Sequence, residues 1–306
     1  MKKFIFRSFI YLLIIVAVNA VILRIAENRY WKISTPAIKK KLIDKGEHEV
    51  SIVLGASQAY HGAKSNLIGN NFYNLAANSQ SLLEDFYILK NLSGSKDVKS
   101  VILSISYSSN HFYLATASSG ERTRIFEYEH VYGIWYNHDV AYYKNKFNFM
   151  GPVAKSLIEN SVNTLHDQYG NLNYVCDFNL SMDKKKHNVS DSATKFKSHN
   201  QKADFDVINP YLDSIIAFCS GRDIKLNLVV FPLTKGYKNE IKRNNPRSEF
   251  ENFLNKLKQR QSDKMKFIDC RDLIADNEDA YFKDADHVNA CGRDSLSGYL
   301  SRVILR

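Results

Sequence analysis

Short β-branched segments alternate along this chain with segments of helical periodicity, and this alternation restricts the fold more than any other feature. Five segments have the composition of buried strands: 49–54, 72–75, 98–105, 226–231 and 266–269. Four segments between and after them predict helices: 81–92, 209–220, 249–260 and 289–304. Such an order produces βαβ units, which form a parallel sheet with helices on both faces. The predicted fold class is therefore α/β, a flavodoxin-like three-layer sandwich with a five-stranded parallel sheet.

A long apolar run near the N-terminus predicts a transmembrane helix. Asn19 alone interrupts residues 9–23, and extension back to Phe4 gives a segment of 20 residues. About 20 helical residues cross a hydrocarbon core of about 30 Å. A cleaved signal peptide is the alternative, with Val18-Asn19-Ala20 as a cleavage site. The apolar run continues beyond that site to Leu23, which favours a retained anchor.

Charges on the two sides of this run bear on its orientation. Lys2, Lys3 and Arg7 precede it, so the positive-inside rule places the N-terminus in the cytoplasm and the rest of the chain outside. The basic residues 39–41 lie on the far side and weaken this assignment. They belong to a short basic helix expected at 35–45, which either lies on the membrane or forms a solvated linker.

The chain is predicted to have three parts: a membrane anchor at 1–26, a basic stalk at 27–48 and an α/β domain at 49–306. Residues 107–202 break the alternation and predict an insert. Its first part, 107–150, has 12 aromatic residues in 44, and its last part, 183–202, is polar and charged. The aromatic rings form either a packed core, which we prefer slightly, or faces that stack on sugar rings.

Composition limits the partners. The net charge of +10 suggests an acidic neighbour: a membrane surface, an anionic glycan or nucleic acid. No recognised nucleic-acid-binding motif is present, and the predicted location argues against that partner. The four cysteines are far apart and include no C-x-x-C pair, which argues against a cysteine-built metal site. Their spacing leaves the disulfide pairing open: Cys176, Cys219, Cys270 and Cys291.

Ser57 is the candidate nucleophile. It directly follows the first predicted strand, in Leu54-Gly55-Ala56-Ser57. A tight turn at the carboxyl end of a strand exposes a hydroxyl beside backbone N–H groups. A serine there can attack an acyl carbon while N–H groups stabilise the oxyanion. A serine in this position is also a common helix N-cap, so the residue alone is a weak signal.

His287 is the candidate base. It lies between the last predicted strand and the last predicted helix, at the same edge of the sheet as Ser57. Neutral imidazole can accept a serine proton near neutral pH. Asp284, three residues earlier, can bind the other ring nitrogen and fix the tautomer. Asp286 is the competing partner, and it could instead cap the last helix.

The motifs around Ser57 and His287, near the start and the end of the predicted domain, together resemble those of the SGNH/GDSL hydrolase superfamily. The resemblance rests on Gly55-Ala56-Ser57 near the start of the domain and Asp284-x-x-His287 near its end. It extends to the block 73–81 and to Phe231-Pro232-Leu233-Thr234, which is similar to a strand end of that superfamily. With the N-terminal anchor, the chain looks like membrane proteins of cell-envelope acyl transfer, of the lipoteichoic acid D-alanylation and alginate acetylation types.

The resemblance implies an oxyanion hole. Ser79 stands where the family has a glycine that donates its backbone N–H, and the N–H survives that change. The family's asparagine donor has no clear match; Asn110 is the nearest candidate and Asn78 is another. Ala56 replaces the usual Asp or Ser before the nucleophile. The loss of one oxyanion donor costs about 10² to 10³ in rate.

The remaining histidines carry weaker signals. His61 lies four residues after Ser57 and is expected to be a packed or surface residue. His111, His130 and His138 have no convincing metal spacing, and no glycine-rich phosphate loop occurs. We expect no metal and no cofactor.

The sequence therefore predicts a single-pass membrane protein with its α/β domain in the periplasm or at the cell surface. The leading hypothesis is a serine esterase or O-acyltransferase that acts on acyl esters, acetyl foremost, of an extracytoplasmic glycan. The alternative is a catalytically impaired scaffold of the same fold that binds glycan or a membrane-bound acyltransferase. A third hypothesis is a structural membrane protein whose aromatic insert is an interface.

Overall fold

The computed structural model describes residues 2–117, 119–158, 165–176, 196, 205, 208–245, 247–274 and 278–305. Within these residues, five parallel strands form one sheet in the order β2-β1-β3-β4-β5. This confirms the predicted fold class, and the strand bounds differ from the expected ones by at most two residues. The strands are β1 (Glu49–Leu54), β2 (Phe72–Asn74), β3 (Asp97–Ile105), β4 (Lys225–Val230) and β5 (Met265–Asp269).

Helices cover both faces of the sheet because successive strand residues point to opposite sides. Ile52 and Leu54 face one core, which α5, α11 and α13 complete, whereas Val53 faces a second core shared with α3, α4 and α15. The helices on the first side are α5 (Leu82–Leu92), α11 (Pro210–Gly221) and α13 (Glu249–Gln259). Those on the second side are α3 (Ser57–Gly62), α4 (Ser65–Ile68) and α15 (Ala290–Ile304).

Local sequence explains several helix ends. Ser81 and Glu84 form the expected capping box at the start of α5, with the Glu84 carboxylate 2.8 Å from the Ser81 backbone N–H. Asn209 caps α11 by accepting the Tyr211 N–H at 3.0 Å. Two further helices, α12 (Lys235–Asn244) and α14 (Glu278–Tyr281), precede and follow the α13–β5 unit. The polar α12 has few apolar residues, so periodicity did not predict it; the Thr234 side chain caps it.

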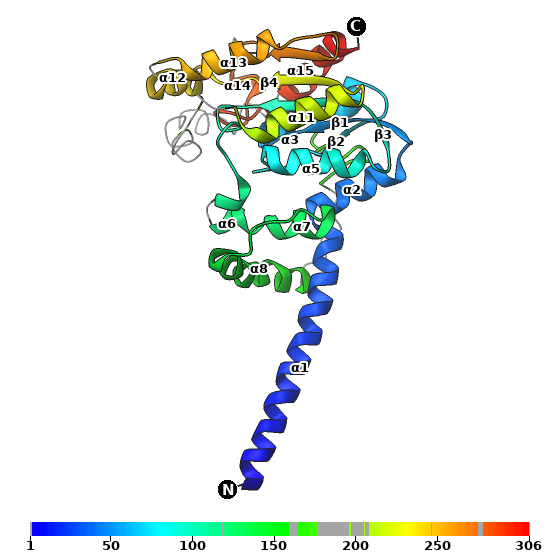
Figure 1. The fold of residues 1–306 in the computed structure, drawn as a ribbon, viewed down its shortest axis with the longest axis vertical. Helices are drawn as coiled ribbons and strands as arrows, with labels where there is room; N and C mark the ends of the chain where they lie inside the picture. Colours follow the sequence, from blue (N-terminus) through cyan, green and yellow to red (C-terminus); the bar gives the residue numbers. More distant parts are fainter. Residues whose placement is uncertain are drawn as a thin grey trace.

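The anchor is one continuous helix. α1 (Lys2–Ile33) projects away from the rest of the molecule, with the N-terminus at its far end (Figure 1). Its segment Phe6–Ile33 is long and apolar enough to cross a membrane, and an 18-residue stretch within it has a mean hydropathy of 2.5 and little burial inside the protein. Most apolar side chains between Phe4 and Ile25 are exposed. A helix that exposes so much apolar surface needs an apolar environment.

The basic helix expected at 35–45 is present as α2 (Thr35–Lys45). It packs on the α/β domain through buried Pro36, Lys39 and Ile43, which differs from a solvated linker. Lys39 is only 1% exposed although it lies in the basic run. The stalk is therefore part of the folded unit.

Helices of the insert lie between the sheet and the anchor (Figure 1). They are the short η1 (Leu114–Thr116) and α6 (Ser119–Arg122), then α7 (Ile125–Tyr132) and α8 (Val140–Ile158). Seven of the aromatic side chains of 107–150 are at most 6% exposed, in line with the preferred packed core: Tyr107, Phe126, Tyr128, Tyr132, Tyr136, Tyr142 and Phe149. The polar part predicted at 183–202 lies outside the described residues, apart from Phe196.

One disulfide joins Cys176 to Cys291, and Cys219 and Cys270 are buried free thiols. The bridge ties the segment 165–176 to the first turn of α15, just after His287. Burial raises the pKa of each free thiol to about 12, so neither is a reactive thiolate at neutral pH.

We predict that this disulfide stabilises the domain. Replacing both Cys176 and Cys291 with Ser should lower the free energy of unfolding by about 2–5 kcal/mol, because the bridge closes a long loop. Urea unfolding of the full chain in detergent measures the change. Wild type with dithiothreitol should match the double variant, and the double variant should not respond to the reductant. An unchanged midpoint in the variant would show that the bridge adds no stability.

Candidate active site

Ser57 and His287 come from opposite ends of the domain and meet at the carboxyl edge of the sheet. Ser57 is the first residue of α3, immediately after β1, and His287 lies in the loop between α14 and α15. The Ser57 Oγ lies 2.7 Å from the His287 Nε2. The contact is a short hydrogen bond between residues 230 positions apart. Ser57 remains partly exposed, so a substrate can reach its hydroxyl.

Asp284 completes the row of three side chains. Its two carboxylate oxygens lie 3.0 and 3.1 Å from the His287 Nδ1. Its Oδ1 also accepts the backbone N–H of His287 at 3.0 Å, which holds the loop in place. A carboxylate at Nδ1 favours the tautomer with the proton on that nitrogen, which leaves Nε2 to accept the serine proton.

Asp286 is closer to His287 than its position in the sequence suggested. Its Oδ1 lies 3.4 Å from the same Nδ1, and the side chain is 4% exposed. It does not cap the last helix, as one alternative proposed: the Asn289 side chain accepts the N–H groups of Cys291 and Gly292 there. The possible ligand atoms of Asp284, Asp286 and His287 lie within 4.8 Å of one another, a grouping that can hold an ion. Because the same imidazole contacts Ser57, we assign no metal to it.

The turn before Ser57 depends on a glycine. Gly55 has φ +122°, and a Cβ atom there would lie 2.5 Å from the Cβ of Ser104 on β3. Only glycine combines that backbone angle with so close an approach. The Gly55 carbonyl accepts the Ala77 N–H at 3.2 Å, which brings the loop after β2 beside the nucleophile turn.

Ser79, the predicted oxyanion donor, adopts the left-handed conformation that a glycine would favour. Its φ is +55°, which costs of order 1 kcal/mol or more for a residue with a side chain. The Ser79 Oγ donates to Glu121 of α6 at 2.7 Å. The backbone oxygen of Asn78 accepts a hydrogen bond from Arg124. Residues of the insert thus hold the loop that carries two of the three predicted oxyanion residues.

Asn110 is attached to a different element. Its side-chain oxygen accepts the backbone N–H of Asn209 at 2.8 Å, and its carbonyl accepts the Asn209 side-chain amide at 3.1 Å. These bonds hold Asn110 to the start of α11. Its role as an oxyanion donor stays a prediction.

Lys39 is a residue near the site that sequence reasoning missed. Its ammonium donates to the Ala76 carbonyl and lies 4.5 Å from the centre of the Tyr60 ring. Burial holds the pKa of Lys39 well below its usual value. A run of three lysines on a predicted surface helix gave no signal that the first would be buried.

Asp85 is a second missed residue, at the start of α5. Its Oδ1 accepts the backbone N–H of Gly55 at 2.8 Å and the Gln80 side-chain amide at 2.6 Å. Gln80 in turn accepts the Tyr128 hydroxyl at 2.8 Å. Burial raises the pKa of Asp85 to about 7, although hydrogen bonds from Gln80 and Gly55 oppose this. A buried network of hydrogen bonds from Tyr128 through Gln80 and Asp85 to Gly55 therefore holds the turn that precedes Ser57.

The other histidines have separate environments. The His61 ring lies 5.0 Å from the His287 ring, edge to face, so it packs beside the candidate base. His130 stacks on Trp31, and His138 contacts Glu129 at 3.0 Å. His166 lies 3.0 Å from the Tyr60 hydroxyl, and burial and the Lys39 charge lower the pKa of His166 to about 4. His111 packs against Tyr107 and Phe205.

Comparisons with known proteins give little for this chain. No family model matches it, and no curated protein matches it. It is similar to a solved structure described as "a putative platelet activating factor from Streptococcus pneumonia". The two chains are 12% identical, the match covers 94% of this chain and 99% of the other, and the TM-score is 0.41. A likeness at this TM-score supports no conclusion about the function of this chain.

We predict that Asp85 makes the stability of the domain depend on pH. Its pKa is raised by folding, so the unfolded chain ionises near pH 4 while the folded protein keeps the proton until about pH 7. The associated stability is present below pH 4 and is lost as the pH rises to 7. Across this range wild type should lose at least about 1.4 kcal/mol relative to Asp85→Asn, which cannot ionise.

Urea unfolding at pH 4 to 8 measures this difference. Asp263→Asn, a change at an exposed position, is the matched control and should follow wild type at every pH. Parallel pH profiles for wild type and Asp85→Asn would contradict the prediction.

Proposed function

We propose that this protein is a membrane-anchored serine esterase or O-acyltransferase of the SGNH type. Its substrates would be acyl esters, acetyl foremost, of an extracytoplasmic glycan. The observation that carries the proposal is the row of contacts from Ser57 through His287 to Asp284, at 2.7 Å and 3.0 Å. A surface serine and a solvated loop histidine would have no reason to meet in this geometry.

The geometry supports acyl transfer through a covalent intermediate. The Ser57 Oγ attacks the acyl carbon as the His287 Nε2 takes its proton, and Asp284 stabilises the resulting imidazolium. Backbone N–H groups at Ser57 and Ser79 stabilise the negative oxygen of the tetrahedral intermediate. The imidazolium returns its proton to the leaving alcohol, which leaves an acyl-serine. Water or a sugar hydroxyl then attacks that ester, with His287 again as the base.

Two observations support an extracytoplasmic location. α1 provides a helix that can cross a membrane, and Lys2, Lys3 and Arg7 precede its apolar run. The disulfide between Cys176 and Cys291 is typical of proteins outside the reducing cytoplasm. On this side of the membrane the hydroxyl and ester groups of envelope glycans are the available substrates, and a membrane-bound acyltransferase would be the partner that supplies acyl groups.

A catalytically impaired scaffold is the second candidate. Asn110 is bonded to Asn209, and Ser79 holds a left-handed angle that a glycine would adopt at lower cost. These features concern the stabilisation of the oxyanion, whereas the contact between Ser57 and His287 is complete. A protein of this kind would keep the fold and bind glycan or an acyltransferase without forming an acyl-serine.

Labelling with a fluorophosphonate tests the proposal. The full chain in detergent should react covalently at Ser57, because this probe captures a serine that a base has activated. Ser57→Ala should not label, and His287→Ala should label about 10² to 10⁴ times more slowly. Ser214→Ala and His48→Ala, at positions away from the site, are the matched controls and should label like wild type. Labelling that persists in Ser57→Ala, or its absence from wild type, would count against the enzyme and favour the scaffold.

We also predict that Asp284, not Asp286, orients the base. Asp284 places two oxygens at 3.0 and 3.1 Å from Nδ1, whereas Asp286 places one at 3.4 Å. Asp284→Asn should therefore slow labelling by up to about 10⁴, because an amide can favour the wrong tautomer. Asp286→Asn should slow it by less than about tenfold. The reverse order of the two rates would assign the orienting role to Asp286.

A further inference from the structure

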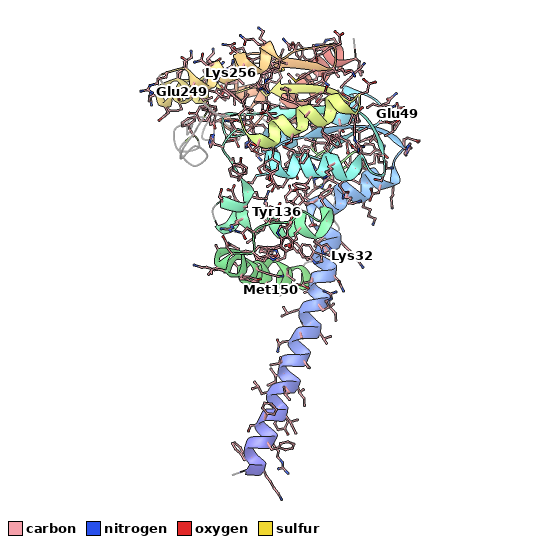
Figure 2. The ribbon with its side chains drawn as sticks, viewed as in Figure 1. Lys32, Glu49, Tyr136, Met150, Glu249 and Lys256 are labelled. Carbon is pink, nitrogen blue, oxygen red and sulfur yellow. A yellow bond between two sulfur atoms is a disulfide. The ribbon has the colours of Figure 1, made fainter. Side chains whose placement is uncertain are left out.

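A cleft of about 600 Å³ lies where the anchor helix meets the folded domain. Three elements form its walls: the end of α1, the exposed side of α2, and the end of α7. The residues that line it include Trp31 and Lys32 of α1, and His130 of α7. Figure 2 shows Lys32 at this junction, close to the level of Met150 on α8 and far from Glu249 and Lys256 at the other end of the domain.

The cleft is strongly basic. Lys32, Lys40, Lys41 and Lys45 all line it, and Asp44 is the acidic residue among its lining side chains. Asp44 forms an ion pair with Lys40 at 2.7 Å, which leaves three lysine charges not balanced by that carboxylate. The side chains of Lys32, Lys41 and Lys45 are exposed. Four lysines around one cleft repel one another, so the site favours an anion that neutralises them.

Its walls are held in place independently of any ligand. The Trp31 ring stacks on the His130 ring, with centres 4.4 Å apart and planes 12° from parallel. Trp31 also stacks on Phe149 of α8 at 5.3 Å. On the α2 side, the Lys96 ammonium donates to the backbone oxygens of Asp44 and Gly46 at 3.2 and 2.9 Å. The basic side chains therefore project from a rigid frame.

The membrane-facing end of the cleft lies at the level of the headgroup layer of a bilayer. The uninterrupted apolar run ends at Leu23, Arg24 follows with 77% of its side chain exposed, and Ile25 is the last exposed large apolar residue of α1. If the hydrocarbon core ends there, Asn28 lies about 7 Å beyond it and Trp31 about 12 Å, at 1.5 Å per residue. The polar layer of a bilayer is about 5–8 Å thick on each side, so Asn28 lies within it and Trp31 lies just beyond it. A helix tilt of about 20–40° lowers Trp31 only to about 9–11 Å. Tryptophan is enriched at this level, and lysine side chains there extend toward the headgroups.

We propose that this cleft binds the phosphate-bearing headgroup of an anionic membrane phospholipid. The lysines of α2 and Lys32 would surround the phosphate, and Trp31 would lie against the glycerol region, while the acyl chains stay in the leaflet beside α1. A lipid fits better than a soluble anion because the cleft opens beside the helix that spans the membrane. The binding would fix the rotation of the domain about α1 and so the distance of its catalytic edge from the bilayer. It does not require Ser57 to be active.

Lipid retention by the full chain in detergent tests this site. Native mass spectrometry should find that phosphatidylglycerol binds at least about tenfold more tightly than phosphatidylcholine, because each lysine near an anionic lipid adds a favourable electrostatic contribution to the binding free energy. The variant Lys32→Gln/Lys41→Gln/Lys45→Gln should lose that preference. The control Lys242→Gln/Lys256→Gln/Lys258→Gln removes the same charge from exposed positions on α12 and α13, and should keep it.

Trp31 offers a second measurement at the site itself. The chain has two tryptophans, so Trp135→Phe leaves Trp31 as the sole one. Its emission should shift when phosphatidylglycerol is added, and the shift should disappear in the triple cleft variant. Ser57→Ala should retain the lipid fully, which separates this proposal from the fate of the proposed enzyme.

Three results would overturn the inference. One is equal retention of the two lipids by wild type, and another is undiminished phosphatidylglycerol binding by the triple cleft variant. The third is displacement of the lipid by an equal concentration of glycerol phosphate, which would identify a site for a soluble anion instead.

Discussion

The pairing of β1 with β3 is the constraint on which the rest of this structure depends. β2 lies on one side of this pair and β4 on the other, so the chain crosses over in opposite directions from the two strands. In open α/β sheets, ligands bind at the carboxyl ends of the strands at such a point. Gly55 lets the chain turn there against Ser104 of β3, and the turn places Ser57 at this edge of the sheet. The loop before α15 delivers His287 to the same edge. The contact between Ser57 and His287 is thus a consequence of strand order, and the two residues need no proximity in sequence.

Parts of the chain that carry no catalytic residue nevertheless shape the site. The loop after β2 passes Gly55 and then receives hydrogen bonds from Lys39 of α2 and from Arg124, while Ser79 bonds to Glu121. Tyr30 of the anchor helix donates to Glu127 of α7, three residues after Arg124. The membrane-proximal helices therefore hold the candidate oxyanion loop directly. Backbone strain at Ser79 persists because these surrounding contacts determine the loop.

Periodicity and local chemistry account for the parts of the structure that the sequence predicted. β-branched runs identified the strands, and the Ser81 and Glu84 pair identified the start of α5. Ser57 directly follows the first strand and His287 lies on the loop before the last helix, which predicted that both lie at the same edge of the sheet. The roles of Lys39 and Asp85 could not be predicted, because they depend on burial by segments distant in the chain. The spacing favoured Asp284 over Asp286 as the partner of His287, but the sequence could not show that the Asp286 carboxylate also comes within 3.4 Å of the same ring nitrogen. The pairing of Cys176 with Cys291 likewise depends on the path of the insert.

The anchor, the insert and the catalytic edge act mechanically as one unit. An anchor joined to its domain by a flexible stalk would leave the site free to face any direction, and the protein would meet soluble and membrane-bound substrates alike. Here Trp31 and Tyr30 are packed into α7 and α8, and α2 is buried against the domain, so the orientation of α1 fixes the orientation of the site. Because α1 is long and apolar enough to cross a membrane, this junction sets the direction of the candidate site relative to the helix that could cross it.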